Sequence, residues 1–200
     1  MKTKPFFFLL IVGSLFCSWH ASSQPDPDIT GKFSAIKEAG QINLVFQYDQ
    51  MQVGSVGKEE TYINKRMSEY EAKNPGKGDD WLVEWKEIKR NAEEVFAKAL
   101  NKKLSKKYGT MVGQDYPDAE YTFVVNFITL EIGWSGGFVS GSGMAFFYFK
   151  LCKTADLDNA IGKMVTYGMA DMESVKMRMA GIYQNAANRI TKILEKNVQK

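Results

Sequence analysis

A stretch rich in glycine and serine, residues 133–143, is the most conspicuous candidate for a binding site. Glycine lets backbone amides approach a ligand closely, and exposed aromatic side chains give a large contact area at low entropic cost. The stretch lacks the Lys-Ser/Thr ending of a phosphate loop and leads into a predicted strand. A flexible hairpin connection is the plainer interpretation of this stretch, and contact with a ligand or partner is the functional one. The predicted contact residues are Trp134, Gly136, Gly137 and Phe138.

Two groups of carboxylates suggest a different chemistry. Asp115, Asp118 and Glu120 precede a predicted strand, and Asp156 and Asp158 lie in a predicted turn. Such groups could bind calcium or supply an acid and a base for glycan hydrolysis. The turn lacks the glycine and the distal glutamate of a calcium loop, and aspartate commonly starts turns. Solvated turn residues are the favoured interpretation, and a carboxylate-based hydrolase acting on glycans is the alternative function.

The positions of histidine and cysteine exclude several kinds of catalysis. The single histidine, His20, and one of the two cysteines, Cys17, both lie in a predicted leader. A mature chain would keep only Cys152, so it could form no intrachain disulfide. It would also lack a Ser-His-Asp or Cys-His arrangement and a zinc site of cysteine and histidine. We therefore expect no metal and no cofactor, and we favour a protein that is not an enzyme.

The first 23 residues have the layout of a secretory signal peptide. Lys2 and Lys4 precede an apolar run over residues 6–16, and small residues follow at 21–23. The run is shorter than the roughly 18 apolar residues of a membrane span. We therefore predict cleavage after residue 23, no transmembrane span in the mature chain, and a location in the periplasm or outside the cell.

Cys17 supports a second interpretation of the leader. It closes the apolar run, as the acylated cysteine of a bacterial lipoprotein does. The residue before it is Phe16, where a small residue would be expected. A protein that is free after export remains the favoured prediction, and a lipid anchor through Cys17 is the alternative.

The charge balance gives no sign of a nucleic-acid partner. The whole chain has 26 Lys and Arg against 23 Asp and Glu, and removing Lys2 and Lys4 leaves 24 against 23. We expect the partner to be an envelope protein or a small ligand instead. Because sheet edges invite pairing, a homodimer is a further expectation.

Periodicity predicts one α+β domain over residues 33–200, after an extended lead-in over 24–32. The predicted strands are 41–49, 119–132, 144–153 and 161–167. The predicted helices are 59–73, a longer one capped by Asp79 and Asp80 and ending before Gly109, and one from 173 to the end. This order suggests a two-layer sandwich, with a mostly antiparallel sheet of about four strands and helices on one face.

Three methionines lie in and just before the last predicted helix, at Met172, Met177 and Met179. Methionine repacks easily, so these side chains could form an adaptable surface for a partner. Core filling is the favoured interpretation, because it is the usual role of methionine at helical spacing.

Four short segments of the first half carry a resemblance to known proteins: Ile42–Phe46, Met51–Gly54, Glu59–Ile63 and Asn74–Asp79. Together they resemble an uncharacterised family of exported bacterial α/β proteins, over about half of the chain. In element order alone, the sequence is loosely similar to small envelope lipoprotein domains, which implies no functional residue. The resemblance and the exclusions above favour a non-catalytic exported module of the cell envelope.

Overall fold

Three helices and a short 3-10 helix accompany a β-sheet in the computed structural model, which describes residues 29–133, 135–136 and 139–198. The sheet strands are β1 (Ile29–Gly31), β2 (Gln41–Gln47), β3 (Gln52–Val53), β4 (Gly57–Lys58), β5 (Met111–Gly113), β6 (Tyr121–Glu131), β9 (Gly143–Lys153) and β10 (Asp156–Ala170). A separate hairpin pairs β7 (Ser135–Gly136) with β8 (Val139–Ser140). The helices are η1 (Ser34–Lys37), α1 (Glu59–Glu71), α2 (Lys77–Tyr108) and α3 (Val175–Asn197). The predicted leader lies outside the described residues.

The predicted fold class is wrong in its sheet. Eight strands form one sheet in the order β1-β10-β9-β6-β2-β5, with β3 beside β6 and β4 beside β3. The prediction was a mostly antiparallel sheet of about four strands, whereas β2 pairs in parallel with both β5 and β6, and β3 pairs in parallel with β6. The physical reason is that the four added strands contain only two or three residues each, too few to show a period.

The predicted meander of three strands is confirmed by the pairing of β6, β9 and β10. The three strands lie side by side and antiparallel, and β6 and β9 are joined through the β7-β8 hairpin. Residues Thr122 to Val125 of β6 are all buried, as expected for a central strand covered on both faces. The long strands therefore form the centre of the sheet.

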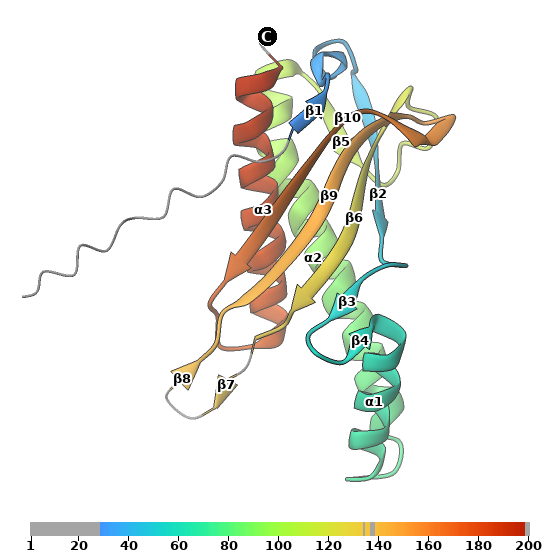
Figure 1. Cartoon of the computed structure of the whole chain (residues 1–200), viewed down its shortest axis with the longest axis vertical. Helices are drawn as coiled ribbons and strands as arrows, with labels where there is room; N and C mark the ends of the chain where they lie inside the picture. The colour runs from blue at the N-terminus through green and yellow to red at the C-terminus, as the bar shows by residue number, and fades with distance from the viewer. Residues whose placement is uncertain (1–28, 134, 137–138, 199–200) are drawn as a thin grey trace, which may run out of the picture.

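The parallel pairing of β2 and β6 follows from the two helices between them. A parallel connection needs a crossover of a dozen or more residues, and α1 and α2 supply it. Figure 1 shows α2 and α3 side by side behind the sheet. Their apolar stripes and the facing side chains of the sheet form the core, including Phe96, Phe127, Phe147, Tyr183 and Ile190.

The hairpin of α1 and α2 extends beyond the sheet (Figure 1) and is closed by a carboxylate. The prediction that Asp79 and Asp80 cap α2 is wrong, because the helix begins at Lys77 after the left-handed Gly76. The Gly76 N–H donates to the Glu71 carboxylate at 2.9 Å, and the Gly78 N–H donates to Glu71 Oε2 at 3.1 Å. These backbone hydrogen bonds lower the pKa of Glu71 below its usual value. The start of α2 thus already holds an anionic group.

Candidate functional site

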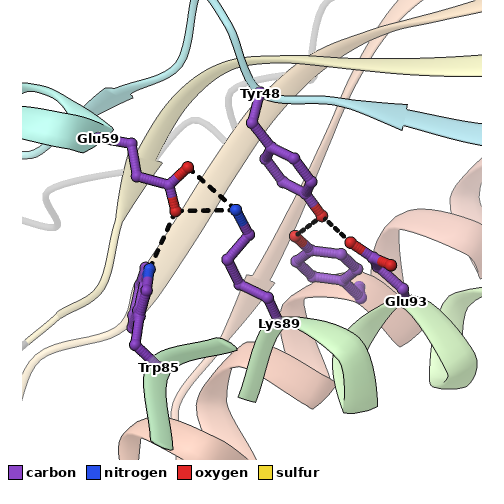
Figure 2. Close-up of polar contacts among 6 residues, drawn as sticks. Tyr48, Glu59, Trp85, Lys89 and Glu93 are labelled. Atoms are coloured by element: carbon purple, nitrogen blue, oxygen red, sulfur yellow. Dashed lines mark hydrogen bonds and ion pairs between the residues drawn. The ribbon is translucent and has the colours of Figure 1, made fainter. Parts of the chain in front are cut away.

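A chain of hydroxyl and carboxyl groups crosses the region where β2, α2 and α3 meet. The Tyr48 O–H donates to Glu93 Oε1 at 2.7 Å, and the hydroxyl oxygens of Tyr48 and Tyr183 lie 3.0 Å apart (Figure 2). Because the Tyr48 proton points to Glu93, Tyr183 is the donor to Tyr48. The second oxygen of Glu93 accepts from Gln114 Nε2 at 3.3 Å. The chain therefore links three elements that are distant in the sequence.

An ion pair adjoins this chain on the side of α1. Lys89 Nζ contacts Glu59 Oε1 at 2.8 Å and Oε2 at 2.9 Å, and the Trp85 indole N–H donates to Glu59 Oε1 at 2.9 Å. The side chains of Lys89 and Glu59 are only 18% and 14% exposed, whereas the other described ion pairs have at least one partner that is 39% exposed or more. Figure 2 shows how the pair and the tyrosine chain lie beside each other.

The ring of Tyr48 is covered on its faces by groups of the protein itself. Lys89 Nζ lies 3.6 Å from the ring centroid, and the Phe127 ring stacks on Tyr48 at 4.9 Å. Burial raises the pKa of Tyr48 well above its usual value, and burial likewise raises that of Tyr183. Both phenols therefore stay protonated, and the ring of Tyr48 offers no platform for a stacked sugar or base.

Three hollows adjoin this network, and residues of α2 line the two larger ones. Their volumes are about 310, 330 and 440 Å³. Glu59 lines the two smaller hollows, and Glu93 lines the two larger ones. Both oxygens of each carboxylate already accept hydrogen bonds from the protein. The network is thus suited to fastening β2, α1, α2 and α3 together.

The ion pair allows a direct test of this fastening role. We expect Glu59→Gln to lower the free energy of unfolding by about 2 kcal/mol, because it leaves Lys89 half-buried without its counter-ion. In a Lys89→Met background the same change should cost about half as much, which gives an interaction energy of about 1 kcal/mol in a double-mutant cycle. Urea denaturation gives the free energy of unfolding of the parent protein, the two single variants and the double variant.

The matched control is Glu87→Gln, because Glu87 pairs with Arg90 on the exposed face of α2, the helix that carries Lys89. It should change stability by less than about 0.5 kcal/mol. An equal loss in Glu59→Gln and Glu87→Gln would contradict the fastening role.

The sequence analysis did not predict this network, although the spacing of three of its residues is visible in the sequence. Trp85, Lys89 and Glu93 are spaced four residues apart, so they lie on one face of α2. That face also carries the apolar stripe, and charged residues there need partners when the helix packs. Tyr48 and Tyr183 are 135 residues apart, and their contact has no local signal.

The predicted contact residues fall in the loop between β6 and β9. Gly136 lies in β7, which pairs with β8. Trp134, Gly137 and Phe138 lie outside the described residues, so their role stays a prediction. The structure places the loop at one end of the sheet (Figure 1).

The predicted carboxylates divide between a hollow and solvent. Asp115 lines the hollow of about 440 Å³ together with Glu93 and Glu94. Asp118, Glu120 and Asp158 are exposed, and Asp156 accepts hydrogen bonds from the backbone and side chain of Asn159. Among the described residues, no group of three or more histidine, cysteine or acidic side chains could hold a metal ion. The prediction that Asp156 and Asp158 lie in a turn is wrong, because both belong to β10, which begins at Asp156.

Exposed apolar side chains gather at the turn that joins β10 to α3. We call Met169, Met172, Val175 and Met177 the apolar patch; they are 46%, 41%, 38% and 55% exposed. Met179 is 1% exposed and belongs to the core. Of the three methionines singled out in the sequence, two therefore lie on the surface and one fills the core.

A buried arginine ties the apolar patch to the glycine-rich loop. Arg178 is 1% exposed. Its guanidinium donates to Met172 O at 2.7 and 3.0 Å, to Ile132 O at 2.9 Å and to Glu173 O at 3.4 Å. Ile132 directly precedes the loop, and Gly143 at the other end of the loop packs against the side chain of Arg178. Arg178 thus holds both the glycine-rich loop and the turn that carries the apolar patch.

No helix among residues 29–133 and 139–198 combines the length and the apolar composition that a membrane crossing requires.

Comparisons with known proteins give only a distant likeness in shape. No protein-family model and no curated protein matches the sequence. Among solved structures, the chain is similar to the PelC dodecamer from Paraburkholderia phytofirmans, with 10% identity, a TM-score of 0.41, and coverage of 82% of this chain and 96% of that one. A dodecamer of a PelC variant from the same organism gives 10% identity, a TM-score of 0.38, and coverage of 75% and 89%.

Proposed function

We propose that this chain is an exported, non-catalytic module of the cell envelope that binds a protein partner through the glycine-rich loop and the apolar patch. The observation that carries the proposal is the gathering of four exposed apolar side chains around one turn at the base of the loop. Exposed apolar side chains that lie near one another commonly mark an interaction site. Three of the four are methionines, whose flexible side chains adapt to a partner.

The leader supports export, and the absence of histidine after residue 20 supports a function without histidine-dependent catalysis. Glu59 and Glu93 have a structural role in this protein, because both carboxylates accept hydrogen bonds that join different elements. A glycan hydrolase would need two carboxylates facing one cleft, and none of the three hollows described above is lined by two of the predicted carboxylates.

The proposal is tested by crosslinking in the native host. A photo-crosslinking amino acid at position 177 should capture a reproducible envelope protein. The triple variant Met169→Ser, Met172→Ser and Val175→Ser should reduce the captured amount at least about tenfold, because it removes much of the apolar contact area. Trp134→Ala with Phe138→Ala tests the loop in the same way.

Val83→Ser is the matched control, because Val83 is 67% exposed and lies on α2, away from the loop. The amount of crosslinked partner should stay the same in this variant. Equal capture in the triple variant and the control, with both proteins folded by circular dichroism, would show that the apolar patch is not the contact surface.

A further inference from the structure

Lysines gather at the end of the molecule where both long helices terminate. α2 ends at Tyr108 and α3 at Asn197, side by side and at the end where β1 also lies (Figure 1). η1 is joined to the same end, because the Thr110 hydroxyl, just after α2, donates to Ile36 O at 2.7 Å. We call the exposed lysines of these segments the basic end: Lys32, Lys37, Lys102, Lys103, Lys106, Lys107, Lys192 and Lys196.

Few negative charges balance the basic end. Along α2 the ion pairs of Glu87 and Glu94 stop at Lys98, and no acidic residue follows Glu94 in that helix. Among the described residues, none of the eight lysines forms an ion pair. The acidic residues in or beside these helix ends are Glu38 and Glu195. The surface thus concentrates positive charge, although the predicted mature chain is almost neutral.

The helix dipoles account for only a small part of this excess. A helix C-terminus carries about half a negative charge, and its effect falls off within the last turn. Only Lys106, Lys107 and Lys196 lie in the last turns of α2 and α3. Most of the positive charge is therefore available to an anionic partner.

The carboxylates at this end of the sheet belong to other elements. They lie in the connection from β5 to β6 and at the start of β10: Asp118, Glu120, Asp156 and Asp158. The helices cover the opposite face of the sheet (Figure 1). The excess of positive charge is therefore on the helix side of this end.

We propose that the basic end docks on an anionic membrane surface. Every cation of the basic end is a lysine, whose flexible stem and point charge suit a fluid layer of headgroups, whereas arginine favours planar pairs of fixed geometry. Basic residues at an anionic bilayer add to one another in attraction. The arginines of the chain contact protein groups elsewhere: Arg66, Arg90, Arg178 and Arg189.

The place where the described chain begins agrees with this orientation. β1 starts at Ile29 and lies at the same end as the lysines (Figure 1). The leader therefore joins the domain on this side, and a lipid anchor through Cys17 would be attached there. A membrane thus fits the basic end better than a soluble acidic partner does.

Docking by the basic end would leave the proposed partner surface free. α3 begins at Val175 in the apolar patch and ends in the basic end. It has 23 residues and is therefore about 35 Å long. The glycine-rich loop and the apolar patch would face away from the membrane at that distance.

Co-sedimentation of the exported protein with lipid vesicles tests the proposal. Vesicles of phosphatidylcholine with about 30% phosphatidylglycerol should bind the protein at least about tenfold more tightly than pure phosphatidylcholine does. Sodium chloride at about 0.5 M should remove the difference, because it screens the charges. The quadruple variant should weaken binding to the anionic vesicles at least about tenfold: Lys102→Glu, Lys106→Glu, Lys192→Glu and Lys196→Glu.

The matched control makes the same change in net charge with exposed lysines outside the basic end: Lys65→Glu, Lys73→Glu, Lys86→Glu and Lys176→Glu. It should keep most of the binding. Equal loss in the two quadruple variants, both folded by circular dichroism, or equal binding of the parent to both kinds of vesicle, would overturn the proposal.

Two further measurements separate the membrane from other partners. Soluble glycerol phosphate at millimolar concentration should not displace the protein, and displacement would indicate a site for a single phosphate group instead. The triple variant of the apolar patch should bind anionic vesicles as the parent does. Vesicle binding lost in that variant would move the docking surface to the apolar patch, whereas unchanged vesicle binding leaves the partner contact to be judged by crosslinking alone.

Discussion

Replacing Arg178 with methionine is expected to lower the free energy of unfolding by about 3 kcal/mol. Methionine is similar in length and would fill much of the space, so the loss reports the hydrogen bonds. The guanidinium donates to the backbone carbonyl oxygens of Ile132, Met172 and Glu173, and the Arg178 side chain itself is 1% exposed. Urea denaturation followed by circular dichroism gives the value.

Lys176→Met is the matched control, because Lys176 lies two residues away on the exposed side of α3. It should alter stability by less than about 0.5 kcal/mol. A loss of less than about 1 kcal/mol in Arg178→Met would mean that the carbonyls find other donors. Arg178→Lys should rescue only part of the loss, because an ammonium group cannot reproduce the planar fork of guanidinium.

Arg178 also connects stability with the proposed contact surface. Its hydrogen bonds join the residue before the glycine-rich loop to the turn that carries the apolar patch. If the loop and patch act as one surface, loosening this anchor should weaken partner capture in protein that is still folded. A buried cation held by carbonyl oxygens is costly to place, so its position at this end of the sheet points to a need for a fixed geometry there.

The long elements could be predicted because their periods extend over many residues. Alternation around Leu44 located β2, and helical spacing around Phe96 and Ile190 located α2 and α3. The strands β6, β9 and β10 were also found, since each has at least 11 residues. In these segments burial imposes the pattern, and the pattern can be read without a structure.

The short strands and the parallel pairing could not be predicted in the same way. β3 and β4 have two residues each, and β5 has three. Their existence depends on neighbouring strands and not on their own composition. Whether β2 pairs with β6 in parallel or antiparallel depends on how α1 and α2 cross the sheet, which is a property of the whole chain.

The candidate sites, like the strands, could be predicted from the sequence only in part. The cluster of Met172 and Met177 was visible as a group in the sequence, but its exposure was decided by which side of α3 faces the sheet. The contacts of Arg178 depend on carbonyl oxygens, and every residue has one, so side-chain identity gives no signal for the acceptors. Sequence reasoning therefore finds groups of side chains more readily than it finds their backbone partners.

Gly168→Ala is expected to lower the free energy of unfolding by about 3 kcal/mol, because α3 leaves no room for a methyl group on β10. An added Cβ would overlap the carbonyl oxygen of Ile182 and lie 3.0 Å from the Cβ of Ala186. Both neighbours belong to α3, so relief requires the helix to move from the sheet. Gly40→Ala is the control, because nothing lies within 4 Å of its added Cβ; equal urea midpoints for the two variants would contradict this close packing of α3 on β10.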